Sequence, residues 1–273
     1  MSECVNKLFL QDFKELSTND FDEALISKGT SIYEVIRVMD GVPLFLERHL
    51  ERLKKSANIV KLKLWLTDSE VREQIRRLIK LNGTKDGNVK IVFNYSDKNS
   101  FLVYFLAHHY PKEDQYLNGV PTIIYHGERS NPNAKIINHN FRHEVEKKIS
   151  ESEVYEAILV DNNGCITEGS KSNIFMVKNN SVITAPIETV LPGITRQVIK
   201  EICMNLDIEL KEQKIKEIEI KTLDALFITG TSPKVLPISK VDSLNFKSSA
   251  NSIVLSIMRA YNKIIEDYIK SQK

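Results

Sequence analysis

Apolar residues recur at helical spacing in four stretches of the chain, with charged residues between them. The first stretch, residues 49–59, carries its leucines and alanine on one face, which predicts an amphipathic helix. The second begins at the capping box Thr67-Asp68-Ser69-Glu70 and ends at Asn82-Gly83, a dipeptide that commonly terminates helices. Two more amphipathic helices are predicted at residues 195–206 and 253–269.

A second pattern consists of short runs of β-branched and aromatic residues. Residues 89–95 and 101–107 are such runs, and the polar residues 96–100 lie between them, which predicts a β-hairpin. Further strands are predicted at residues 155–160, 174–177, 182–184 and 226–229. Strands and helices do not alternate regularly, and no glycine-rich dinucleotide or P-loop motif occurs. An α+β architecture is therefore favoured over a βαβ nucleotide-binding fold.

The chain turns polar and rich in turn residues between Tyr110-Pro111 and Asn118-Gly119. Such a stretch is typical of a domain boundary. The sequence therefore predicts a smaller α+β N-terminal domain over residues 1–112 and a larger α+β C-terminal domain over residues 113–273.

The composition narrows the functional classes. The 273 residues include 38 Lys and Arg against 36 Asp and Glu, a net charge of +2, which offers no field for nucleic acid or anionic membranes. The longest apolar run, Phe101 to Ala107, is too short for a membrane helix, and no secretory signal is evident. Three widely spaced cysteines fit reduced thiols, so a cytoplasmic location is expected.

The densest group of chemically useful residues runs from Thr167 to Arg196. Glu168 stands among small polar residues just before an apolar strand, where the ordinary interpretation is a solvated residue in a hairpin loop. Leu191-Pro192-Gly193-Ile194-Thr195-Arg196 then leads into a helical pattern. A helix that starts there presents free backbone N–H groups and the Thr195 hydroxyl, which together can bind an anion.

Two further features strengthen this interpretation. The turn Thr229-Gly230-Thr231-Ser232-Pro233 follows an apolar strand and offers more hydroxyl groups and amides. Arg52 lies on the predicted helix 49–59 and could hold a phosphate through two parallel hydrogen bonds. A carboxylate, two hydroxyl-rich turns and an arginine together suit a phosphorylated cofactor.

These residues resemble the class IV, or fold-type IV, pyridoxal-phosphate (PLP) enzymes. This family includes branched-chain aminotransferases, D-amino acid aminotransferases and aminodeoxychorismate lyases. The resemblance is carried, in order along the chain, by Gly29-Thr30-Ser31-Ile32-Tyr33-Glu34-x-x-Arg37, His49-x-x-Arg52-Leu53, Glu168-x-x-x-x-Asn173-Ile174-Phe175, Leu191 to Arg196 and Gly230-Thr231-Ser232. It implies a two-domain, D-amino acid aminotransferase-like fold, PLP as cofactor and a homodimer.

The resemblance also implies roles for individual residues. Lys135 stands where the family has its K-x-x-N motif, and would bind PLP covalently and move the proton at the reacting carbon. Glu168 would pair with the pyridine nitrogen. Arg52, the Ile194 and Thr195 amides and Thr231 would hold the phosphate. Leu191 would pack on the ring, and the substrate would be met by Tyr33, Arg37, His109 and Ser232.

The implied activity is a ping-pong transfer of an amino group between a small amino acid, branched-chain-like or of D configuration, and a 2-oxo acid. Lys28 and Asn140 depart from the branched-chain pattern, while Asn131-Pro132-Asn133 resembles the lyases. Aminodeoxychorismate lyase, which forms 4-aminobenzoate, is therefore the alternative function, and a non-catalytic PLP-binding protein is a second one. His139 and His143 would share a helix face but lack a third ligand, so no metal site is expected.

Overall fold

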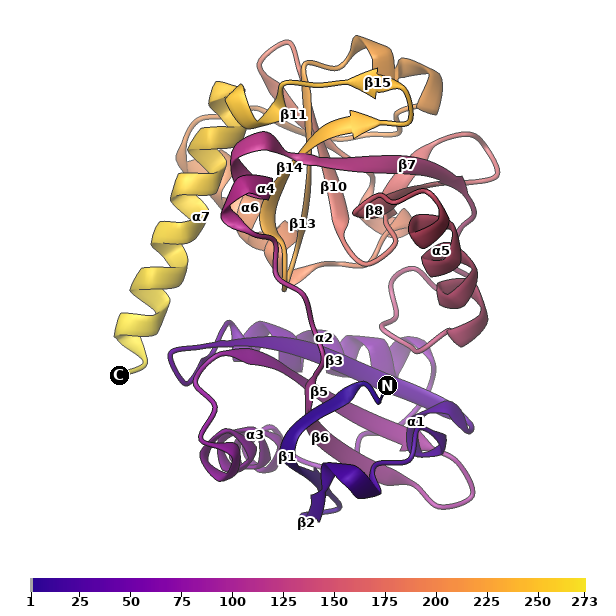
Figure 1. Ribbon diagram of the computed structural model, residues 1–273, viewed down its shortest axis with the longest axis vertical. Coiled ribbons are helices and arrows are strands. Elements are labelled where there is room, and N and C mark those ends of the chain that lie inside the picture. The colour runs from indigo at the N-terminus through magenta and orange to yellow at the C-terminus, as the bar shows by residue number, and fades with distance from the viewer. Residues whose placement is uncertain (1) are drawn as a thin grey trace. The chain divides into compact units, whose positions relative to one another are not determined.

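The computed structural model describes residues 2–273, apart from the side chain of His139 (Figure 1). Contacts along the backbone divide the chain into two compact units. The first comprises the residues up to His109 together with Ala134–Ile137 and Ile265–Lys273, and the second comprises Tyr110–Asn133 and Asn138–Ile264. Lys135, which we expected in the C-terminal domain, is thus grouped with the first unit. That the chain divides into two domains at residue 112 remains a prediction.

The first unit is built on a six-stranded sheet with the order β2-β1-β6-β5-β3-β4. The predicted hairpin is present, because β5 and β6 pair antiparallel. The strands of this sheet are β1 (Cys4–Gln11), β2 (Lys14–Ser17), β3 (Thr30–Met39), β4 (Val42–Pro43), β5 (Gly87–Tyr95) and β6 (Ser100–Leu106), and the helices are α1 (Ala24–Ser27), α2 (Leu46–Ile59) and α3 (Asp68–Asn82).

Side chains alternate between the two faces of this sheet, as the strand period of two requires. On one face, Ile32 and Ile36 of β3 pack with Leu50 of α2 and Ile75 of α3 in a continuous buried core. The other face carries Tyr33 of β3 with several apolar residues of β5 and β6. Both faces of this sheet therefore carry buried apolar clusters, and helices α2 and α3 cover the first of them.

Helix α3 begins and ends as its sequence indicates. The Thr67 side chain accepts a hydrogen bond from the Glu70 amide while the Glu70 carboxylate accepts one from the Thr67 amide, which completes the capping box. Gly83 ends the helix in the left-handed region with φ 59°. Local chemistry alone sets both ends of this helix.

The second unit is built on a nine-stranded sheet with the order β12-β11-β10-β13-β14-β7-β8-β9, and β15 pairs with β14. Its strands are β7 (Val120–His126), β8 (Glu156–Val160), β9 (Ile166–Gly169), β10 (Asn173–Lys178), β11 (Ser181–Thr184), β12 (Leu210–Glu212), β13 (Ala225–Gly230), β14 (Lys234–Val241) and β15 (Leu244–Asn245). Its helices are α4 (Glu113–Asn118), α5 (His139–Glu151), α6 (Ile194–Asn205) and α7 (Ser252–Ser271), whose last residues belong to the first unit.

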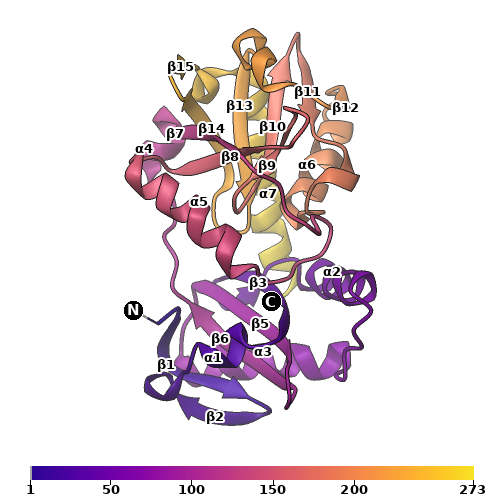
Figure 2. The same cartoon turned by 90° about the vertical axis from the view of Figure 1, so that its right-hand side faces the viewer.

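Helices cover this second sheet with apolar faces. Val145 of α5 packs with Ala157 and Leu159 of β8, and Figure 2 shows the helix against β7 and β8. Helix α6 contacts β13, and its buried residues include Val198 and Ile202. Helices and strands do not alternate regularly, and most neighbouring strands in both sheets pair antiparallel, so the predicted α+β class is confirmed. No helix within residues 2–273 is both long and apolar enough to cross a membrane.

Candidate active site

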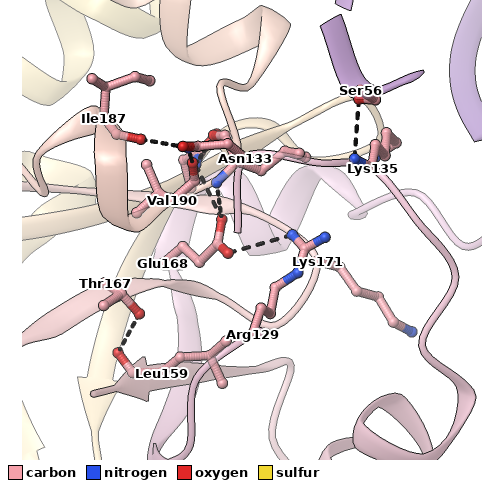
Figure 3. Close-up of polar contacts among 12 residues, drawn as sticks. Ser56, Arg129, Asn133, Lys135, Leu159, Thr167, Glu168, Lys171, Ile187 and Val190 are labelled. Atoms are coloured by element: carbon pink, nitrogen blue, oxygen red, sulfur yellow. Dashed lines mark hydrogen bonds and ion pairs between the residues drawn. The ribbon is translucent and has the colours of Figure 1, made fainter. Parts of the chain in front are cut away.

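Lys135 lies in a short extended segment that adds to the first sheet at the edge of β3. The Tyr33 amide donates to the Lys135 carbonyl at 3.1 Å, and the Ile137 amide donates to the Ser31 carbonyl at 3.1 Å. The Lys135 amide in turn donates to the Ser56 hydroxyl of α2 at 3.1 Å, as Figure 3 shows. Backbone pairing therefore fixes the position of Lys135.

This pairing determines which face of the sheet receives the lysine side chain. Ile32 and Ile136 are opposed in an antiparallel bridge, and both belong to the helix-covered core. Because neighbouring residues point to opposite faces, Tyr33 and Lys135 share the other face. The Lys135 Nζ lies 4.8 Å from the centroid of the Tyr33 ring, within cation–π range. The structure thus brings together a predicted catalytic residue and a predicted substrate residue.

Arg52 is buried on α2, where Glu34 of β3 holds it in one orientation. The Arg52 Nε donates to Glu34 Oε1 at 2.7 Å and its Nη2 donates to Glu34 Oε2 at 2.6 Å. The His49 Nδ1 lies 2.8 Å from the same Oε2. A guanidinium that is fixed through two of its nitrogens presents its remaining N–H groups in a defined direction.

The charges in this group influence one another strongly. Burial alone raises the pKa of Glu34, but the Arg52 guanidinium and the His49 ring outweigh burial and lower it to about 2. Burial lowers the pKa of His49, and the Glu34 carboxylate opposes this while the Arg52 and Lys135 charges add to it. Lys135 is thus close enough to His49 for its charge to act on the imidazole ring.

The remaining substrate residues predicted for the first unit occupy different environments. Arg37 lies on β3 four residues after Tyr33, so it belongs to the same face and is half-buried. His109 is exposed in the loop after β6. Its neighbour His108 is half-buried, and burial together with the charge of Arg37 lowers the pKa of its ring. His108 is therefore the histidine whose charge couples to Arg37.

In the second unit, Glu168 lies in strand β9 and is only 3% exposed, so it is not a solvated loop residue. The Leu191 amide donates to its Oε2 at 3.0 Å, and the Asn173 side-chain amide lies 3.5 Å from the same oxygen. The Arg129 guanidinium lies 3.4 Å from its Oε1 (Figure 3). Three donors therefore fix the position of the carboxylate.

The start of helix α6 follows directly after these contacts. Gly193 is its N-cap and provides no side-chain cap, so the Ile194 and Thr195 amides begin the helix without one. A Cβ at position 193 would lie 2.0 Å from the Asn173 Oδ1, so only glycine fits there without displacing Asn173. The Thr195 hydroxyl is buried, 3.4 Å from the Tyr261 hydroxyl.

Thr231 and Ser232 lie in the turn between β13 and β14, and both are half-buried. Next to them, Thr229 is 1% exposed, and its hydroxyl has no hydrogen-bond partner among the described residues. The Asn133 side-chain amide donates to the carbonyls of Ile187 and Val190 at 2.7 Å each (Figure 3). These two hydrogen bonds fix the position of Asn133, two residues before Lys135.

The chemistry of these groups fits PLP. A pyridine nitrogen needs a fixed carboxylate, which Glu168 supplies, and a phosphate needs amides, hydroxyls or a guanidinium. The uncapped amides of α6, the partnerless Thr229 hydroxyl and the oriented Arg52 are groups of those types. By contrast, no cluster of three His, Cys, Asp or Glu suited to a metal ion occurs among the described side chains, which do not include that of His139.

Several residues that contact the predicted site residues were not assigned a role by sequence analysis: Glu34, His49, Arg129 and Asn173. Glu34, His49 and Asn173 stood inside quoted motifs, and the spacing of His49 and Arg52 along one helix was an available signal. Arg129 had no local signal, because it reaches Glu168 across 39 residues of sequence.

Comparison with known proteins agrees with this chemistry. The model of the family "Amino-transferase class IV" matches residues 31–241. A D-alanine aminotransferase of Staphylococcus epidermidis is 30% identical over 256 residues, which cover 89% of each chain. An aminodeoxychorismate lyase of Bacillus subtilis is 24% identical over an alignment that covers 97% of this chain and 95% of the relative.

Solved structures show the same fold. The branched-chain amino acid aminotransferase of Escherichia coli matches with a TM-score of 0.85 at 22% identity, covering 95% of this chain and 94% of that one. The branched-chain aminotransferase of the archaeon Thermoproteus uzoniensis, solved with norvaline, matches with a TM-score of 0.84 at 23% identity over 97% and 98%. The predicted fold-type IV architecture is therefore confirmed. Since the family model spans well over half of its length, the chain belongs to the class IV aminotransferases, a family of PLP-dependent enzymes.

Proposed function

We propose that this protein is an aminotransferase that moves an amino group between a small amino acid and a 2-oxo acid by a ping-pong mechanism, with PLP as cofactor. The observation that carries the proposal is the buried Glu168 carboxylate, held by the Leu191 amide at 3.0 Å. A carboxylate that is fixed in position can pair with the pyridine nitrogen of PLP and keep that nitrogen protonated. Membership of the family supports the activity.

When bound, PLP supplies a ring that withdraws electrons from the carbon that carries the amino group. Lys135 would hold the cofactor covalently until the incoming amine releases it. Its free amine would then move the proton between that carbon and the C4′ atom of the cofactor. Its backbone is fixed by Tyr33 and Ser56, so its amine acts from a defined position. Glu168 would keep the ring nitrogen protonated.

The remaining predicted residues would bind and orient the cofactor and the substrate. Arg52, oriented by Glu34, and the uncapped Ile194 and Thr195 amides would hold the phosphate, together with Thr231. Leu191 would pack on the ring through its side chain while its amide holds Glu168. Tyr33, Arg37, His109 and Ser232 would contact the substrate, and we further propose that the protein assembles as a homodimer.

Aminodeoxychorismate lyase is the second candidate. The Bacillus subtilis enzyme of that name is similar to this chain over 97% of its length. A lyase would use the same lysine for proton transfer and the same carboxylate to pair with the ring nitrogen, so the two activities differ in the substrate bound rather than in these residues. The substrate-facing residues must therefore be tested with substrates.

A spectral titration decides between these functions. Single L- and D-amino acids are added to the PLP-loaded protein, the absorbance of the bound cofactor is followed, and the 2-oxo acid formed is measured. The proposal expects at least one amino acid to bleach the band and a 2-oxo acid to restore it. Release of pyruvate and 4-aminobenzoate from aminodeoxychorismate, without transfer to any 2-oxo acid, would instead identify the lyase. A band that no amine changes would identify a non-catalytic PLP-binding protein.

A further inference from the structure

A buried lysine lies on the same sheet face as Tyr33 and Lys135. Lys90 of β5 is 3% exposed, and its Nζ donates to the Glu3 Oε1 at 2.7 Å. The same nitrogen lies 5.1 Å from the centroid of the Tyr33 ring and 5.7 Å from that of Tyr104. The lysine therefore has one ionic partner and two aromatic ones, all within the first unit.

Glu3 is held in this position by the backbone as well as by its side chain. The Ala107 amide donates to the Glu3 carbonyl at 2.8 Å, just after β6 ends. The Glu3 Oε1 accepts a hydrogen bond from the Tyr104 hydroxyl in addition to that from Lys90. The Glu3 side chain is 30% exposed whereas that of Lys90 is 3% exposed, so the carboxylate can reach water and the ammonium cannot.

This ion pair lies close to the reacting amine. Lys135 and Lys90 have their Nζ atoms 4.8 and 5.1 Å from the same Tyr33 ring centroid, so they are at most about 10 Å apart. A substrate carbon bound where Lys135 reacts carries a side chain that, with two methylenes and a carboxylate, extends roughly 4 Å. When such a side chain extends along this face of the sheet, its carboxylate approaches the ammonium group of Lys90.

We propose that Glu3 determines substrate specificity: by occupying Lys90 and Tyr104 it excludes acidic side chains, so that the enzyme selects amino acids and 2-oxo acids with uncharged side chains. This inference rests on the proposed aminotransferase function and names its substrate class. Glu3 acts as a built-in competitor for the buried Lys90 ammonium group.

The competition favours Glu3 because it is part of the chain. Glu3 and a substrate carboxylate would form the same kind of ion pair with Lys90, so the pair energies nearly cancel. A tethered group, however, competes at an effective concentration of order millimolar or higher, and its position here is already fixed by the backbone. If Glu3 were removed, Lys90 would be a buried cation without a counter-charge, which attracts any carboxylate that can reach it.

The test compares acidic with uncharged substrates in the PLP-loaded protein. In Glu3→Gln the side chain keeps its size and an oxygen for Tyr104 but loses its charge. We expect the ratio of kcat/KM for 2-oxoglutarate to that for pyruvate, and for glutamate to that for alanine, to rise about tenfold or more. The matched control is Glu15→Gln, which removes an exposed carboxylate paired with Arg77 at 2.5 Å in the same unit, and which should leave both ratios unchanged.

A second variant separates specificity from stability. Adding Lys90→Met to Glu3→Gln should abolish the gain for acidic substrates, because the attracting charge is then gone. Calorimetric titration with glutarate provides a readout that is independent of turnover, and binding should tighten in Glu3→Gln only while Lys90 is present.

Three outcomes would overturn the inference. It is wrong if the wild-type protein uses glutamate as efficiently as alanine, if Glu3→Gln leaves the ratios unchanged, or if Lys90→Met does not reverse their rise. In each of these cases uncharged amino acids still react, so the proposed aminotransferase function stands. If no amino acid of either kind reacts with the wild-type protein, the proposed function itself fails.

Discussion

Replacing Glu34 by Gln tests whether the buried group around Arg52 is held together by charge. Glu34 is fully buried and accepts both hydrogen bonds from Arg52 and one from His49. In Glu34→Gln the amide preserves the shape but removes the negative charge that pairs with the buried guanidinium. Removing one partner of a buried ion pair typically costs about 3–5 kcal/mol.

The pKa of Glu34 gives an independent magnitude. Its pKa is about 2 in the folded protein against an ordinary value of 4.5. Each pKa unit corresponds to about 1.4 kcal/mol, so ionised Glu34 contributes about 3 kcal/mol to the free energy of unfolding. Because the folded pKa is the lower one, this contribution is fully present above pH 4.5 and is lost as the pH falls towards 2.

The single tryptophan of the chain allows a direct assay. Trp65 packs edge-on against Phe93 and Tyr95 within the first unit, so its fluorescence reports the unfolding of the unit that contains Glu34. Urea unfolding of the protein without PLP should show Glu34→Gln to be less stable by about 3 kcal/mol at pH 7. The difference between the two proteins should shrink as the pH is lowered below 4.5.

A matched control separates burial from charge. Glu47 pairs with Arg72 at 2.9 Å on the surface of the same unit, and its side chain is 55% exposed. Glu47→Gln should cost less than about 1 kcal/mol, because water screens the pair. A loss in Glu34→Gln no greater than in the control, or a loss that does not change with pH, would refute the reasoning.

Three further predictions concern local structure. In Gly193→Ala the new Cβ would lie 2.0 Å from the Asn173 Oδ1, so Asn173 must move and PLP should bind more than tenfold more weakly, as measured by absorbance titration; wild-type affinity would show the contact to be harmless. Thr67→Ala removes the capping box of α3 and should lower the stability reported by Trp65 by about 1 kcal/mol; no change would mean that the cap contributes nothing. Burial raises the pKa of Glu156 above its ordinary value of 4.5, so the ionised carboxylate opposes folding. In circular dichroism melts, the stability of Glu156→Gln relative to wild type should therefore increase as the pH rises above 4.5. A stability difference that does not depend on pH would contradict this.

The sequence predicts those elements whose signals are local. Helix α3 was placed almost to the residue because Thr67, Glu70 and Gly83 form its ends by themselves. The start of α2 was missed by three residues, because its N-cap is Phe45, a residue with a left-handed φ of 52° and no capping side chain. A phenylalanine is not a helix-start signal in sequence, and the left-handed backbone conformation of Phe45 is imposed by the surrounding fold.

The candidate site shows the same limit. A motif could propose Lys135, but no local pattern predicts that its segment pairs with β3, about a hundred residues earlier in the chain. The burial of Glu168 could not be read from its polar neighbours either, since it follows from the Leu191 amide 23 residues away. Lys90 and Glu3 are 87 residues apart, and only the folded sheet brings them together.

The central claim is that Lys135 is the amine that binds the cofactor covalently. Borohydride reduces the carbon–nitrogen double bond between a lysine and PLP to a stable single bond, and peptide mass spectrometry then locates it. The account predicts that after reduction of the PLP-loaded protein the added mass is found on the peptide that contains Lys135, and that Lys135→Met abolishes it. A label on any other lysine, or no label at all, would contradict the account.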